Sequence, residues 1–322
     1  MSVTSETAYC DGGLEAGQSL FIAVRMESMP TNPKPPPVVR PSSDPQKDLL
    51  RQVTASLKDG SLELPSLPDV ALEVRSVAAE RDLGISDLVT VIQQDPGLST
   101  YLIKVSNSVY YRRAKPALTL AQAISRLGVS STRDLSSSYA IRTLFFMRNK
   151  EIKGYLRDIW QRSVYTGSLA HVMAERCNIA PDRALLAGLI QDIGALPLLM
   201  HLEKYPRLLA DRDKVTALIS EYSGKISALI LNAWHFDNEL VNVGLERENW
   251  LRDKRPQADL ADLILVARYH TYIGETAVRG LPPLFQIPAF RKLPLGELDP
   301  EEGLAFIKTA KAEVEAMRQA LV

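Results

Sequence analysis

Residues 95–105 read DPGLSTYLIKV, and this stretch decides the fold class. Asp95 can accept hydrogen bonds from the first backbone amides of a helix, and Pro96 has the backbone angle of a first helical position. The apolar side chains behind them recur at the i, i+3, i+4 and i+7 spacing of one helix face: Leu98, Tyr101, Leu102 and Val105. The stretch therefore predicts a helix that buries one side.

The same pattern recurs along most of the chain. It predicts a helix with Val70, Val74 and Val77 after Pro68, one with Leu88 to Ile92 capped by Ser86, one from Thr119 to Gly128, one opened by Ser130, one with Leu185 to Ile193 that stops at Gly194, one with Ile226 to Ala233, one with Leu260 to Ala267, and a last one opened by Asp299 and Pro300. Alternating strand patterns are nearly absent. We expect an all-α protein, a multi-helix bundle of two packed helical subdomains.

Composition excludes several classes of protein. The 322 residues carry 38 basic and 38 acidic side chains, so the formal net charge is zero. Nucleic-acid binding through bulk positive charge is therefore not expected. Cys10 and Cys177 have no Cys or His neighbours at metal spacing, which excludes a disulfide framework and a zinc ribbon. No apolar run approaches the ~18 residues of a membrane span, so we expect a cytoplasmic protein without a membrane partner.

The first 45 residues differ from the rest. Seven of the sixteen residues from Pro30 to Pro45 are proline, which favours extended polyproline geometry. We expect 1–45 to be a disordered tail, either a flexible leader or a docking peptide, with Met1, Met26 or Met29 as the natural start. The expected helical domain is 46–322, divided into subdomains 46–148 and 149–295 and a C-terminal helix 296–322.

Two groups of motifs resemble a known family. The first group is LPSLP (64–68), IQQDPGL (92–98), VSNSVY (105–110), AQAI (121–124) and LG (127–128). The second is AGLIQDIG (187–194). Their order and spacing resemble the HDOD family, the HD-related output domains of bacteria, over about Leu64 to Arg268. The family motif residues Asp95, Pro96, Asn107, Ser108, Tyr110, Gly128 and Gly194 are expected to be mainly structural. The resemblance implies a second half similar to the HD superfamily.

The resemblance also locates a metal site to compare with. A working HD phosphohydrolase uses a histidine, a His-Asp pair and a later aspartate to hold a divalent metal. Here those positions read Arg162, Gln191-Asp192 and Arg268, and Glu246 and Arg247 stand near the place of further histidines. His171 would face the opposite side of the helix from Arg162. We expect a vestigial site with no catalytic residues, no metal and no cofactor. We also expect Arg162 or Arg268 to pair with Asp192.

Other polar residues have plainer interpretations. Asn107 is expected to be a left-handed cap, Ser108 to bond nearby backbone, and Tyr110 to pack with its hydroxyl at the surface. His201, His235 and His270 are expected at surfaces or interfaces. Arg176 could lower the pKa of Cys177, but ordinary burial is favoured. Arg112, Arg113 and Lys115 form a basic cluster that is either solvated or able to touch phosphate.

Three functions follow from this comparison. The first is a stand-alone, non-catalytic regulatory module that binds another signalling protein, such as a kinase, a receiver or a cyclic-dinucleotide enzyme. The second is a residual metal-dependent phosphohydrolase of nucleotides or cyclic dinucleotides. The third is a metal-free sensor in which Arg162, Arg268 and Gln191 meet an anionic small molecule. The sequence does not identify the partner or the oligomeric state.

Overall fold

The computed structural model describes residues 55–56, 59, 64–80, 84–108, 110–111, 113–146, 150–273, 280–294, 312, 314–315 and 319. These residues form helices and connecting turns, and no strand occurs among them, so the all-α prediction is confirmed. The chain divides into the units Met1–Ser43 and Asp44–Val322. The predicted tail, 1–45, and most of the predicted helix in 296–322 lie outside the described residues.

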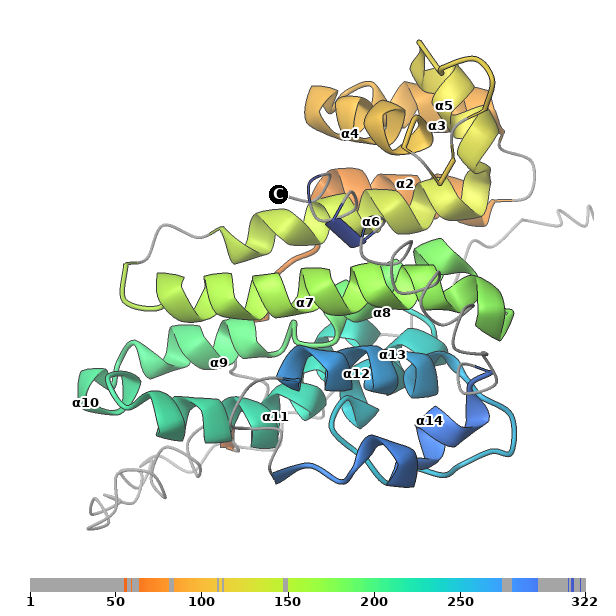
Figure 1. The fold of residues 1–322 in the computed structure, drawn as a ribbon. Coiled ribbons are helices and arrows are strands. Elements are labelled where there is room, and N and C mark those ends of the chain that lie inside the picture. Colours follow the sequence, from red (N-terminus) through yellow and green to blue (C-terminus); the bar gives the residue numbers. More distant parts are fainter. Residues whose placement is uncertain are drawn as a thin grey trace, which may run out of the picture. The chain divides into compact units, whose positions relative to one another are not determined.

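The N-terminal helices form a group of their own at the top of Figure 1. They are α2 (Asp69–Ala79), α3 (Ile85–Ile92), α4 (Pro96–Ser106), α5 (Leu120–Leu127) and α6 (Val129–Phe145). Helix α5 packs on α3 and α4, while α2 packs on the long α6. Helix α6 also contacts α8, so it joins this group to the rest of the domain.

Local hydrogen bonds explain where these helices begin. The Asp95 carboxylate accepts from the amide of Leu98 at 2.9 Å, as predicted. Thr119 and Gln122 form a reciprocal capping box at the start of α5. Two predicted caps are wrong. Helix α3 begins after Gly84, whose amide donates to Asp87, and Ser86 lies inside the helix. Helix α6 begins directly after Gly128 at φ 83°, so Ser130 lies in its first turn.

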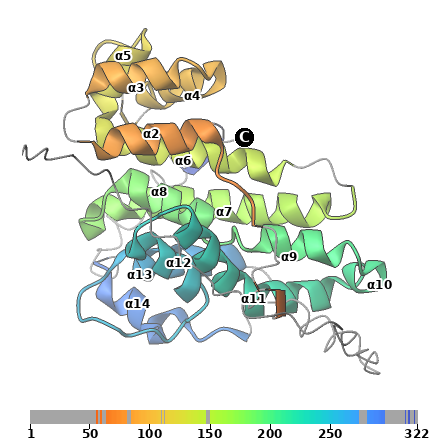
Figure 2. The same cartoon turned by 180° about the vertical axis from the view of Figure 1, so that it is seen from behind.

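Helices α7 and α8 pack on each other, and the helices from α9 to α14 lie on the side away from the N-terminal helices (Figures 1 and 2). In chain order they are α7 (Lys153–Ala174), η1 (Glu175–Cys177), α8 (Pro181–Ile190), α9 (Ala195–Leu202), α10 (Pro206–Leu209), α11 (Arg212–Ala233), α12 (Asn238–Glu246), α13 (Leu260–Tyr269), η2 (His270–Tyr272), η4 (Leu284–Gln286) and α14 (Pro288–Lys292). Helix α13 packs on both α7 and α8, and α12 lies between α11 and α13.

Two glycines set the distance between α7 and α8. A Cβ atom on Gly188 would lie 2.4 Å from the Cα of Gly167, so both positions need glycine for the backbones to meet. Helix α8 ends at Ile190, earlier than the predicted stop at Gly194. A turn over 191–194 follows, and a Cβ on Gly194 would lie 2.2 Å from the carbonyl oxygen of Ser223 on α11. This turn therefore sits tightly between α8 and α11.

One apolar cluster runs through the described part of the domain, from Leu67 to Leu293. The stretch Pro181–Leu202 is long and apolar enough to cross a membrane, but 89% of the tested window is buried inside the protein. That burial is what a core helix of a globular domain shows. The subdomain boundaries at 148/149 and 295/296 remain predictions.

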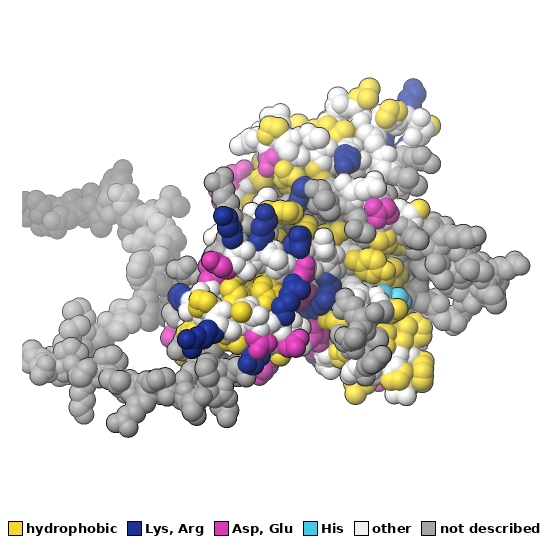
Figure 3. Space-filling view, turned by 60° about the vertical axis from the view of Figure 1, so that its left-hand side comes forward, with side chains coloured by type: hydrophobic (Ala, Val, Ile, Leu, Met, Phe, Trp, Pro, Cys, Tyr) yellow, Lys and Arg dark blue, Asp and Glu magenta, His cyan; other side chains and the backbone are white. Residues whose placement is uncertain are grey.

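The surface agrees with the neutral composition. On the face in Figure 3, basic and acidic side chains lie interspersed around apolar patches. Some surface charges form pairs, such as Arg212 with Asp158 at 2.5 Å.

Candidate functional site: a buried arginine–carboxylate cluster

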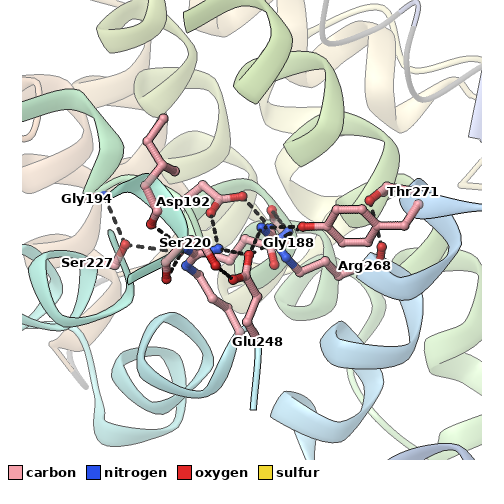
Figure 4. Close-up of polar contacts among 12 residues, drawn as sticks. Gly188, Asp192, Gly194, Ser220, Ser227, Glu248, Arg268 and Thr271 are labelled. Carbon is pink, nitrogen blue, oxygen red and sulfur yellow. Dashed lines mark hydrogen bonds and ion pairs between the residues drawn. The ribbon is translucent and has the colours of Figure 1, made fainter. Parts of the chain in front are cut away.

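Asp192 lies at the centre of the second half of the domain, in the turn that follows α8, and its side chain is buried. Arg268, on α13, donates from Nη1 to Oδ2 of Asp192 at 2.5 Å. Arg247, directly after α12, places its Nη1 3.0 Å from Oδ1. The predicted pairing with Arg268 is therefore confirmed (Figure 4), and the guanidinium of Arg247 lies beside the other oxygen.

A second carboxylate, Glu248, completes the cluster. Its Oε1 accepts from Arg247 Nη1 at 2.5 Å and from Arg268 Nη2 at 2.7 Å. Its Oε2 accepts from the hydroxyl of Ser220 on α11. Two guanidiniums thus face two carboxylates, and the four formal charges cancel.

Backbone groups and an aromatic ring hold the arginines in place. Arg247 Nη2 donates to the carbonyl oxygen of Ile219 at 2.6 Å and to that of Ser220 at 3.2 Å. Arg268 Nη2 lies 3.2 Å from the hydroxyl of Tyr272, one helical turn further along the chain. The cluster therefore ties α11, α12, α13 and η2 to the turn after α8.

The arginines decide the charge state of Asp192. Burial alone would raise the pKa of this carboxyl, but the guanidiniums of Arg268 and Arg247 outweigh burial. The pKa of Asp192 therefore lies below its ordinary value, and the side chain is ionised at neutral pH. The same two arginines outweigh burial at Glu248 and lower its pKa.

Gln191 makes its side-chain hydrogen bond to the backbone and not to a residue of this cluster. Its Nε2 donates to the carbonyl oxygen of Gly188 at 3.1 Å, and its Oε1 is buried without a hydrogen-bond partner. The Ser227 hydroxyl accepts from the amide of Gly194 at 2.9 Å and donates to the carbonyl oxygen of Gln191 at 3.0 Å. Ser227 therefore clamps both ends of the turn onto α11 (Figure 4).

Arg162 reaches the cluster from α7 through an aromatic ring. Its guanidinium carbon lies 4.9 Å from the centre of the Tyr272 ring. On its other side Arg162 lines a surface pocket of about 620 Å³. The other lining residues are Asp158, Gln161, Tyr165, Arg212, His270, Thr271 and Ile273.

These residues do not fit a catalytic metal. A divalent cation needs carboxylate or imidazole donors with lone pairs directed at it. The Asp192 oxygens face guanidiniums, and the positions of the expected histidine and aspartate carry positive charge. Glu246 turns elsewhere, to Lys254 and Asn249. Within the described residues, no three His, Cys, Asp or Glu side chains form a metal-binding group.

Sequence reasoning missed a second polar cluster. The Nε2 of His171, on α7, lies 3.5 Å from Oδ1 of Asp182, which also accepts from the hydroxyl of Tyr111. The ring of Tyr110 packs edge-on against His171, and its hydroxyl donates to Glu175 at 2.7 Å. His171 therefore pairs with Asp182, and its placement on the opposite side of α7 from Arg162 stays a prediction. No local signal joins these residues because they come from distant segments.

The remaining polar residues have structural contacts. Asn107 has φ −100°, so the predicted left-handed cap is wrong. Its side chain instead exchanges two hydrogen bonds, each 2.8 Å, with the backbone of Ala117. The Ser108 hydroxyl is buried without a hydrogen-bond partner, contrary to prediction. Burial raises the pKa of the Cys177 thiol to about 11, so no activating effect of Arg176 is found.

The three other histidines occupy ordinary positions. His235 is exposed and closes α11 with φ 55°. His201 is half-buried and packs on Tyr205, and burial lowers its pKa. The Nδ1 of His270 lies 2.8 Å from the carbonyl oxygen of Val266.

Comparison with known proteins identifies the family. Residues 64–249 match the HDOD domain. The chain belongs to the HDOD family. An uncharacterized protein of Treponema pallidum is 24% identical over 208 residues, which is 59% of this chain but only 39% of that relative. This HDOD chain thus spans about two fifths of the curated relative's length.

Solved structures agree with this assignment. The crystal structure of a "Putative metal-dependent phosphohydrolase" from Shewanella amazonensis is 26% identical, with a TM-score of 0.74, and the match covers 84% of this HDOD chain and 99% of that chain. A "Putative signal transduction protein" from Marinobacter aquaeolei is 21% identical, with a TM-score of 0.59 over 86% of this chain and 66% of that one. The second likeness concerns the fold alone.

Proposed function

We propose that this HDOD protein is a non-catalytic regulatory module of bacterial signal transduction that acts by binding another signalling protein. The observation that carries the proposal is the pairing of both Asp192 oxygens with the guanidiniums of Arg268 and Arg247. Both oxygens of this carboxylate face guanidiniums, which would repel a metal ion, so the residue best placed for metal chemistry instead pairs with two neighbouring segments of the core.

A phosphohydrolase is the alternative, because the Shewanella protein carries the name of one. Activity requires a cation to displace two arginines from Asp192 and to find further ligands. The test supplies purified protein with Mn²⁺ or Fe²⁺ and offers bis-p-nitrophenyl phosphate and cyclic di-GMP. We expect no turnover above buffer. Stoichiometric metal in the purified protein, together with turnover that Asp192→Asn abolishes, would contradict the proposal.

Partner binding is tested in the native bacterium. The tagged full chain is crosslinked in living cells and purified, with an unrelated tagged helical protein of similar size as the control. We expect specific enrichment of a kinase, a receiver or a cyclic-dinucleotide enzyme. Failure to enrich any protein over the control, with the chain shown to be folded by circular dichroism, would refute this function.

A metal-free sensor of an anionic small molecule is the third candidate. Of the three residues expected to contact such a ligand, Arg268 and Gln191 are buried, while Arg162 lines the 620 Å³ pocket beside Arg212 and His270. Pyrophosphate is a suitable first probe. It should raise the melting temperature of the wild type and of an Arg207→Gln control, but not of Arg212→Gln. An equal response of all three proteins would exclude this pocket.

A further inference from the structure

We propose that a groove beside α5 in the N-terminal helices docks a short acidic segment of a partner protein, which inserts an apolar side chain next to Leu118. This inference rests on the proposed function and names the surface that performs it. The groove has a volume of about 790 Å³. Its lining residues are Ile85, Arg113, Lys115, Pro116, Ala117, Leu118, Ala121, Gln122, Ser125 and Arg126.

Leu118 is the main apolar feature of the groove. At 77% it has the highest exposed fraction of the large apolar side chains in the described residues, and Ile85, across the groove, is 39% exposed. A single exposed leucine is ordinary on a protein surface. This one differs because it lines a concave groove and because its backbone is fixed on both sides.

Hydrogen bonds hold the loop before α5 in one conformation. Asn107 pairs with both backbone groups of Ala117, the residue directly before Leu118. Gln122 Oε1 accepts from the amide of Leu118 at 2.8 Å and from that of Thr119 at 3.3 Å. A loop ordered in advance loses little conformational entropy when a partner binds. The exposed leucine is thus presented on a rigid frame.

Arg126 extends the same frame. Its guanidinium donates to the carbonyl oxygens of Ser106 at 2.8 Å and Lys115 at 2.6 Å, and to Oδ1 of Asn107 at 2.9 Å. Asn107, which belongs to the VSNSVY motif, therefore holds this loop through its contacts with Ala117 and Arg126.

The charge of the lining selects the occupant. Arg113, Lys115 and Arg126 line the groove, and no Asp or Glu is among the described lining residues. Complementarity favours a segment that carries Asp or Glu next to its apolar anchor. An apolar concave lining fits an inserted side chain better than a nucleic-acid backbone, which is bound mainly through charge. A partner polypeptide is therefore the occupant that these features fit best.

The test uses a phage-displayed library of random twelve-residue peptides, selected on the full wild-type chain. We expect enriched peptides to combine Leu, Ile or Phe with neighbouring Asp or Glu. Their affinity should fall about tenfold or more with Leu118→Ser and with the double change Arg113→Glu and Lys115→Glu. Leu251→Ser is the matched control, because Leu251 is also highly exposed, at 64%, but does not line the groove.

These substitutions should not affect folding, because the side chains of Leu118, Arg113 and Lys115 are exposed. Their variants should melt like the wild type, and only variants that do so are compared. Enriched peptides without acidic residues, or with equal affinity for Leu118→Ser, would overturn the proposal. Dimerisation that Leu118→Ser abolishes, or binding to phosphatidylglycerol vesicles that the double charge change abolishes, would overturn it in favour of a second copy or a membrane.

The docking groove and the proposed function can fail separately. If the crosslinked native partner remains bound to Leu118→Ser, the groove is wrong while the regulatory function stands. If the wild type has no specific partner in cells, the function fails whatever the peptides do.

Discussion

Removing the charge of Asp192 should destabilise the protein strongly, and a compensating change should recover part of the loss. In the wild type, Arg268 and Arg247 face Asp192 and Glu248, and the charges balance. Asp192→Asn preserves the shape of the side chain but removes its negative charge, so the cluster is left with one excess positive charge. Breaking a buried pair in this way costs about 3–5 kcal/mol. We expect the free energy of unfolding to fall by about 3 kcal/mol, because Glu248 remains 20% exposed and brings water close to one side.

The double variant Asp192→Asn with Arg268→Gln provides the decisive comparison. Each single change leaves the cluster with one unbalanced charge of opposite sign, whereas the double change leaves Arg247 paired with Glu248. If each single change costs about 3 kcal/mol, the double variant should also lose only about 3 kcal/mol instead of about 6, a coupling near 3 kcal/mol. Urea unfolding at pH 7, followed by circular dichroism, measures all four proteins.

Two results would refute this reasoning. Additivity of the single changes within about 0.5 kcal/mol would show that Asp192 and Arg268 do not interact. A loss below about 1 kcal/mol for Asp192→Asn would show that the carboxylate is in contact with solvent.

Three further predictions follow from other contacts. The pKa of Asp192 is lowered in the folded state. Its contribution to stability is therefore present above the unfolded value of 3.8 and is lost as the pH falls through the lower folded value. Between pH 5 and pH 2, the free energy of unfolding should fall less steeply with pH for Asp192→Asn than for the wild type. Gly188→Ala should lower the free energy of unfolding, measured in urea, by about 1–3 kcal/mol or more, because its Cβ meets the backbone of Gly167. The control is Gly154→Ala on α7, which has open space around it and should be neutral or stabilising by up to about 1 kcal/mol. Cys177, with a pKa of about 11 against an ordinary 9.0, should have roughly a hundredfold less thiolate at pH 8, so mass spectrometry should find it alkylated by iodoacetamide much more slowly than glutathione.

Helix positions were largely predictable because the signals are local. Asp95 with Pro96, and Thr119, begin helices where their own side chains and backbone angles predict. Serine often caps helices, so the sequence predicts a cap at Ser86. The structure uses Gly84 instead, since Asp87 reaches back to its amide. The end of α8 was misplaced because the close approach of α11 to Gly194, a tertiary contact, shapes the turn that follows.

The candidate site was predictable only in part. The resemblance places Asp192 and Arg268 at two positions of the same metal site, and their opposite charges then predict that they contact each other. Glu248 and Tyr272 complete the cluster from 56 and 80 positions beyond Asp192 in the sequence, and no periodicity joins such separated residues. The same reason hid the contact between Tyr111 and Asp182. Long-range polar contacts depend on how the helices pack against each other, and the spacing of residues in a single sequence does not reveal that packing.

The arginine–carboxylate cluster makes the charge balance around Asp192 independent of the cell's metal supply. Asp192 is neutralised by cations that are covalently part of the polypeptide, so they are present from the moment the chain is synthesised. Scarcity of iron or manganese leaves the charge balance of these four side chains unchanged. The charges around Asp192 are therefore balanced in the same way in metal-starved and metal-replete cells.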